Sequence, residues 1–354
     1  RKRIHDLGSV LGQAVAPGLN ELETVAQHVS TAVAGTLVFN PSPYQHSEMM
    51  RMSDGSERLA TNVPGLGYAF FPDTGIEGDL VVWEPFDSNY SALGEQLDVK
   101  IDAASGAIAS LVQLADGREW VQTGSDGLNL VDGVRLLDFV AERLVGAATR
   151  LVITRWAPSV GTFTSTITVY DELPWLSLTN ETERVADEQV SFRFHLAASD
   201  PHISWEIPAG RAESTLPVHA LEHLRWICIS GGDASLMFRG YDAPFASVSE
   251  EMTLSSVAPR GISRYRFAPL PRYATHDMPW VFGWNSEPMA VARVVPNGSD
   301  VLPRYGSILE FEKVGVTILG IQPASDGYGA IVYLQETLGV SRTVSVAPGV
   351  LRFS

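Results

Sequence analysis

The chain has 354 residues, of which 45% are hydrophobic and 19% charged, a balance that supports a sizeable buried core and excludes wholesale disorder. Its 25 Lys and Arg against 41 Asp and Glu give a formal net charge of −16, which repels phosphate backbones and excludes nucleic acid as a partner. No apolar run approaches the roughly 20 residues of a transmembrane helix, so the sequence predicts a soluble chain with no membrane partner.

The cysteine usage points to a reducing environment. Cys228 is the single cysteine, so no internal disulfide can form. Its neighbours Trp226, Ile227 and Ile229 are typical of a buried strand rather than of a reactive thiol site. A disulfide-stabilised secreted domain is therefore excluded, and we expect a cytoplasmic location.

A helical segment is expected within residues 1–35. The opening residues 1–5 have no Met and no following apolar stretch, which is typical of an internal edge of a longer protein and not of a signal peptide. Gly35 ends the helical pattern. Residues 1–35 are therefore interpreted as the remnant of an upstream helical bundle. The apolar residues that line one face at a spacing of three to four are Leu19, Leu22, Val25, Ala26, Val29 and Val33.

From residue 36 onward the pattern predicts strands almost throughout. The run Thr36–Phe39 and the loop-rich stretch up to residue 89 predict a small β-domain over residues 36–89. The remaining residues, 90–354, are predicted to form one large antiparallel β-sandwich, because many strands alternate with Gly-containing turns. Its expected strands lie at residues 97–101, 108–114, 150–155, 162–170, 176–183, 190–196, 224–230 and 234–239.

Several stretches resemble, in the same order, the C-terminal region of family 38 glycoside hydrolases, which are α-mannosidase-type enzymes. The resemblance covers essentially the whole chain. Two positions depart from the family's pattern, since Tyr333 stands where Arg is common and Gln322 where Lys is common. The stretches that carry the resemblance are the helical exit into residues 37–42, the hairpin of residues 97–111 with 117–119, Ile207–Gly210 before Arg225–Ile227, and the hairpin of residues 321–329 with 331–336.

The resemblance implies that catalysis and substrate positioning belong to different domains. In such enzymes a divalent metal, usually zinc, and an Asp nucleophile lie in an N-terminal β/α domain, and the reaction retains the anomeric configuration. That domain is missing from this sequence, so the resemblance implies no catalytic residue, metal or cofactor in this chain. The expected partners are the N-terminal catalytic domain and an α-mannoside-type glycan, whose cleft this module would complete.

Five residues are candidates for contact with sugar. Trp280 and Trp284 lie an even number apart, so both occupy one face of an extended strand, and indole rings stack on pyranose C–H faces. A role in the sandwich core is the competing interpretation for both. Asp326 lies in an expected turn beside Gly327, and Tyr333 and Glu336 follow on the next expected strand. The competing interpretation is that Asp326 only forms the turn and that Glu336 is only the solvated end of a strand.

Three alternatives remain open. Large sandwiches of this shape, the galactose mutarotase-like supersandwich, also occur in mutarotases, which use a carboxylate and a His for ring opening. A non-catalytic carbohydrate-binding module is the second alternative. His219 and His223, four residues apart, form a third candidate, a metal site without a visible third ligand. The residues that a mutarotase- or lyase-like enzyme would draw on are Asp200, His202, Glu206, His276 and Asp277.

Overall fold

The computed structural model divides the chain into two compact units. One unit is Trp83–His276, and the other combines Arg1–Val82 with Asp277–Ser354. The described residues are 26–27, 33–42, 45–73, 83–183, 185, 188–207, 210–222, 226–231, 234–243, 245–271, 289–295, 303–307, 309–311, 316–325, 330–336, 341 and 343–348.

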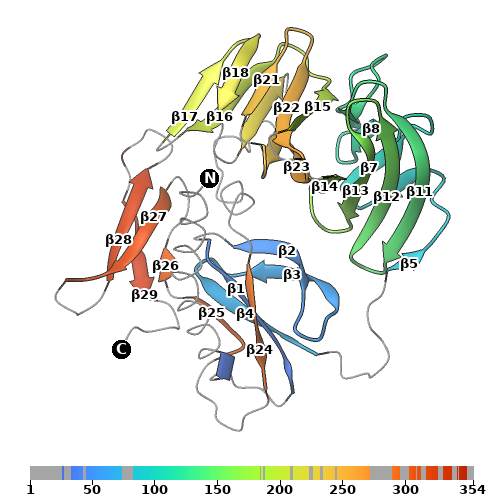
Figure 1. Ribbon diagram of the computed structural model, residues 1–354. Coiled ribbons are helices and arrows are strands. Elements are labelled where there is room, and N and C mark those ends of the chain that lie inside the picture. The colour runs from blue at the N-terminus through green and yellow to red at the C-terminus, as the bar shows by residue number, and fades with distance from the viewer. Residues whose placement is uncertain are drawn as a thin grey trace. The chain divides into compact units, whose positions relative to one another are not determined.

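The unit Trp83–His276 is a sandwich of two antiparallel sheets (Figure 1). In its described residues the larger sheet has ten strands in the order β17-β16-β19-β20-β23-β14-β13-β12-β11-β5. These strands are β5 (Glu84–Pro85), β11 (Arg135–Leu144), β12 (Ala148–Ala157), β13 (Gly161–Tyr170), β14 (Leu176–Thr182), β16 (His202–Ile207), β17 (Gly210–Ser214), β19 (Ile227–Gly231), β20 (Ala234–Gly240) and β23 (Ile262–Pro271).

The second sheet of the sandwich has nine strands in the described residues. Its order is β18-β21-β22-β15-β10-β8-β7-β6, with β9 paired to β8. The strands are β6 (Ser91–Leu93), β7 (Leu97–Ile101), β8 (Ile108–Gln113), β9 (Arg118–Glu119), β10 (Leu128–Leu130), β15 (Gln189–His195), β18 (Val218–Glu222), β21 (Phe245–Val248) and β22 (Thr253–Pro259).

The sandwich core follows from the period-two alternation of its strands. In β13, Phe163, Ile167 and Val169 are buried in the core, while the threonines between them are half-buried on the outer face. Aromatic rings join the two sheets, because Phe194 of β15 lies 5.2 Å from Phe267 and 5.4 Å from Tyr265 of β23, centroid to centroid. Each buried aromatic or aliphatic side chain stabilises the sandwich by about 1.5–3 kcal/mol. The mainly β fold with a large antiparallel sandwich is thus confirmed.

One charged side chain lies inside this core. Arg155 of β12 is fully buried, and burial lowers the pKa of its guanidinium to about 9, so it still carries its charge at neutral pH. Nη1 donates to the backbone carbonyl of Asn129 at 2.8 Å, and Nη2 donates to the Ser165 hydroxyl. The Asn180 amide donates to Asn129 Oδ1 at 2.8 Å and accepts from Asn129 Nδ2 at 2.9 Å. Asn129 belongs to β10 of the nine-stranded sheet, while Arg155, Ser165 and Asn180 belong to the ten-stranded sheet. This network therefore links both sheets.

The second unit contains a four-stranded sheet and three two-stranded antiparallel pairs in its described residues. The sheet order is β24-β1-β4-β25; β2-β3 and β27-β28 are hairpins, and β26 pairs with β29 from further along the chain. The strands are β1 (Gly35–Asn40), β2 (His46–Arg51), β3 (Glu57–Val63), β4 (Gly67–Pro72), β24 (Ala290–Val294), β25 (Tyr305–Ser307), β26 (Leu309–Phe311), β27 (Val316–Pro323), β28 (Ala330–Glu336) and β29 (Val346–Pro348).

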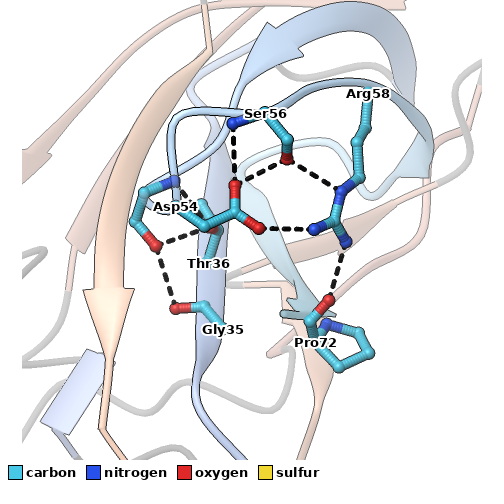
Figure 2. A network of polar contacts seen from close by, with 7 residues as sticks. Gly35, Thr36, Asp54, Ser56, Arg58 and Pro72 are labelled. Carbon is cyan, nitrogen blue, oxygen red and sulfur yellow. Dashed lines mark hydrogen bonds and ion pairs between the residues drawn. The ribbon is translucent and has the colours of Figure 1, made fainter. Parts of the chain in front are cut away.

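A polar network holds the turn of the β2–β3 hairpin (Figure 2). Asp54 Oδ1 accepts from the Ser56 backbone N–H at 2.9 Å, and Oδ2 accepts from Arg58 Nη2 at 2.5 Å. Burial alone would raise the pKa of Asp54, but the Ser56 hydrogen bonds and the Arg58 charge outweigh it and lower the pKa. Arg58 also donates to the Pro72 carbonyl at 2.8 Å, which fixes the turn to the end of β4. All partners are groups of the same unit, so the network is structural.

The division into units differs from the boundaries expected at residues 89 and 90. β24 pairs with β1 along five residue pairs, and β25 pairs with β4, so residues after 277 belong with residues before 82. The sandwich is therefore inserted into a unit built from both ends of the chain. Of the expected helical segment, residues 26–27 and 33–35 are described. Ala26 and Gln27 are helical, and Ala26 is buried in a cluster with Leu37 and Tyr68. Val33, expected on the apolar face of the helix, is instead an exposed bend residue just before β1.

Candidate functional site

The β27–β28 hairpin carries the described part of the predicted sugar-contact site. Gln322 lies opposite Ile331 and Gly320 opposite Tyr333, so these four residues share one face of the hairpin. Tyr333 is 48% exposed and Ile331 is 40% exposed. About half of the Tyr333 side chain is therefore open to solvent.

The two positions that depart from the family's pattern are in direct contact. The amide Nε2 of Gln322 donates a hydrogen bond to the phenolic oxygen of Tyr333, with 2.6 Å between the two atoms. The contact is diagonal across the hairpin, because the residue directly opposite Gln322 is Ile331. Each strand alone offers no sign of this pair, so the sequence analysis missed it.

The other predicted contact residues are not gathered around this pair. Glu336 lies three residues after Tyr333 on β28 and opposite Val316, which places it on the other face of the hairpin. Trp280, Trp284 and Asp326 lie outside the described residues. A sugar contact by any of the five stays a prediction.

The residues considered for mutarotase-type chemistry are separated. His202 is exposed and its Nε2 lies 3.3 Å from Glu213 Oε2. Glu206 is buried, four residues further along the same strand. Four residues of strand span about 13 Å, so His202 and Glu206 cannot act on one sugar atom together. His276 and Asp277 lie outside the described residues, and Asp200 is an exposed turn residue with φ of 51°.

Metal donors are dispersed in the part of the chain that the structure describes. His219 is exposed on β18, and His223 lies outside the described residues. No three His, Cys, Asp or Glu side chains of the described residues gather as a metal site would require. The zinc ion of the resemblance is expected in the N-terminal domain and not in this chain, so no metal-dependent step is assigned to these residues. Cys228 is buried in β19, with its sulfur 3.6 Å from the Ser230 hydroxyl.

The sequence analysis did not predict a cluster of arginines and aromatic rings that lies on the outer face of the ten-stranded sheet. Arg239 of β20 and Arg266 of β23 are direct cross-strand partners, and both are nearly buried. The guanidinium of Arg239 lies 3.8 Å from the Tyr241 ring centroid, and that of Arg266 lies 5.3 Å from the Trp175 centroid. Such contacts hold Tyr241 and Trp175 against the sheet, which is a packing role.

The exposed edge of this cluster is an ion pair. Arg264 donates to both carboxylate oxygens of Asp242, at 2.9 and 2.8 Å. The hydrogen bonds that Arg264 donates to the Asp242 carboxylate raise the pKa of the Arg264 guanidinium above its usual value. In the sequence, Arg264 and Arg266 alternate with the core residues Tyr265 and Phe267, and this alternation was the available signal for a polar outer face.

The described residues contain no helix with the length and apolar character that a membrane crossing requires. No protein-family model matches the sequence, and no curated protein matches it by sequence. The similarity to known proteins is therefore one of fold, found by comparison with solved structures.

The fold is shared with solved structures of glycoside hydrolases. An α-mannosidase from Enterococcus faecalis V583 matches with a TM-score of 0.71 at 10% identity, over 97% of this chain and 55% of its own. A glycosyl hydrolase family 38 protein from Enterococcus faecalis matches with the same TM-score at 9% identity, over 97% of this chain and 57% of its own. The chain thus spans little more than half the length of these two proteins. A galactose mutarotase-like protein from Lactobacillus casei ATCC 334 reaches a TM-score of only 0.35, which supports no inference.

Proposed function

We propose that this chain is the C-terminal, carbohydrate-handling module of a retaining α-mannosidase-type glycoside hydrolase. The observation that supports it is the fold match over 97% of the chain, in both units, to an α-mannosidase and a family 38 protein. The order of the resembling sequence stretches is independent support. In the proposal, the nucleophile, the acid and the divalent metal belong to a further domain, which faces this module across the glycan.

The module's contribution is positioning. A hydrolase gains rate when binding energy away from the reacting bond orients the substrate, and a cleft between domains needs contacts on both sides. In the proposal, the face of the β27–β28 hairpin and the segment with Trp280 and Trp284 supply these contacts. The half-exposed Tyr333 ring supports this assignment. The glycan is an α-mannoside, and the enzyme acts in the cytoplasm.

The test is a comparison of variants within a protein that contains both this chain and the proposed catalytic domain. Trp284→Ala and Asp326→Ala should lower kcat/KM for an aryl α-mannoside without lowering the melting temperature, because they remove sugar contacts and no packing. Leu93→Ala is a matched control, since Leu93 is 62% exposed on the sandwich. Variants that lose stability and keep normal kinetics would assign Trp284 and Asp326 to the core and the turn.

A further inference from the structure

The contact between Gln322 and Tyr333 has consequences for recognition. Within the described part of the chain, this 2.6 Å bond is the one hydrogen bond formed by the side chains of Gln322 and Tyr333. The phenolic oxygen accepts from the amide, so its own O–H is directed elsewhere. The amide oxygen of Gln322 is not used in this bond. The pair therefore presents one donor and one acceptor side by side at the edge of an exposed ring.

The face around the pair is uncharged. By the register of the hairpin it comprises Thr317, Gly320, Gln322, Ile331, Tyr333 and Gln335, and none of them carries a charge. The chain as a whole has a net charge of −16, which disfavours anionic ligands such as sugar phosphates and sugar sulfates. The apolar part of the face, the Tyr333 ring with Ile331, suits the C–H surface of a sugar ring.

We infer that Gln322 and Tyr333 together read two adjacent hydroxyls of a neutral pyranose that stacks on the Tyr333 ring. The inference rests on the proposed function and specifies its ligand. One hydroxyl of a vicinal pair accepts from the Tyr333 O–H, and the neighbouring hydroxyl donates to Gln322 Oε1. The two sugar-facing groups belong to side chains joined by a 2.6 Å hydrogen bond, which brings both within reach of one sugar ring. Gln322 acts partly as a positioning residue, because its amide fixes the direction of the phenolic O–H.

The alternative explanation is a cross-strand pair that only stabilises the hairpin. The two explanations differ in what each substitution changes. Tyr333→Phe keeps the ring for stacking and removes the hydroxyl, and Gln322→Leu keeps the volume and removes the amide. If the pair reads hydroxyls, both variants lose affinity and keep the melting temperature. If the pair is structural, both lower the melting temperature and leave any affinity unchanged.

The experiment is ligand-observed saturation-transfer NMR on the 354-residue chain with four separate probes. These are the methyl α-glycosides of mannose, glucose and galactose, and mannose 6-phosphate. We expect binding of at least one methyl glycoside and weaker binding of the phosphate. Tyr333→Ala should abolish detectable binding, while Tyr333→Phe and Gln322→Leu should each weaken it about two- to tenfold. The double variant should be little weaker than either single one, because the pair acts as a unit.

Tyr305→Ala is the matched control, since Tyr305 is 70% exposed on β25 of the same unit. It should bind like the unmodified chain. Undiminished binding by Tyr333→Ala, tighter binding of mannose 6-phosphate, or no binding of any methyl glycoside would each overturn the inference. The proposed function is tested separately, by measuring hydrolysis with the longer protein. A chain that binds glucoside but not mannoside through Tyr333 would keep the hydroxyl-reading pair and reject the mannoside assignment.

Discussion

Asn180→Ala is expected to be among the most destabilising single substitutions in the sandwich. The Asn180 side chain is fully buried and accepts from Ser165 Oγ at 2.5 Å, in addition to its paired hydrogen bonds with Asn129. Truncation leaves Asn129 Oδ1 without its donor and Asn129 Nδ2 with only a long hydrogen bond of 3.4 Å to Ser165 Oγ, and a buried group that loses its partner costs about 1–3 kcal/mol. It also removes an acceptor from the buried Arg155 charge, whose partners are then fewer. The expected loss in free energy of unfolding is about 3–5 kcal/mol.

The assay is urea unfolding, with the midpoint and the m-value compared among three variants. Arg155→Met should cost less, about 1–2 kcal/mol, because the charge leaves together with its need for partners and the two Asn amides remain paired. Thr179→Ala is the control; Thr179 precedes Asn180 but is half-buried on the outer face, so its loss should change stability by at most about 0.5 kcal/mol. The reasoning is refuted if Asn180→Ala costs under 1 kcal/mol, or if Arg155→Met costs more than Asn180→Ala.

Two further predictions concern individual positions. Burial raises the pKa of the Tyr68 phenol to about 12, so the stabilising effect of the neutral Tyr68 side chain is complete below pH 10 and is lost as the pH rises through 12. Urea unfolding should therefore show a smaller loss of stability between pH 10 and 12 for Tyr68→Phe than for the unmodified chain. Equal losses would contradict this prediction. Gly106→Ala should cost about 2 kcal/mol or more, because φ is +69° and the new Cβ would lie 2.8 Å from Arg155 Cδ. Gly117→Ala, with φ of +71° and open space around it, should cost about half as much, and equal costs would show that the contact with Arg155 does not matter.

Local patterns were sufficient to predict eight of the nineteen strands described in the sandwich. The predicted strand 97–101 coincides with β7, and the predicted strand 162–170 differs from β13 by one residue. Period-two alternation and Gly turns act within a few residues of one another, so a single sequence carries them completely. Gly106 and Gly117 both adopt positive φ in the turns that follow β7 and β8, a conformation that favours glycine.

The parts that were missed depend on contacts between distant residues. The pairing of β1 with β24 joins residues more than 250 positions apart, and nothing near either strand indicates the partner. Arg155 could have been suspected, because it follows Leu151 and Ile153 at the same parity and so faces the core. Its acceptor on Asn129, however, belongs to the opposite sheet. The Gln322–Tyr333 pair depends on hairpin register, which a bulge between Ile318 and Gly320 shifts.

The central claim, that this chain positions a glycan for a catalytic domain elsewhere, is tested most directly by a hydrolysis assay. The 354-residue chain and a longer protein containing it are each incubated with p-nitrophenyl α-mannoside, with and without zinc, and release of nitrophenol is followed. The account predicts metal-dependent release by the longer protein, with retained configuration, and none by the chain alone. Turnover by the purified chain, or a longer protein without activity on α-mannosides, would contradict it.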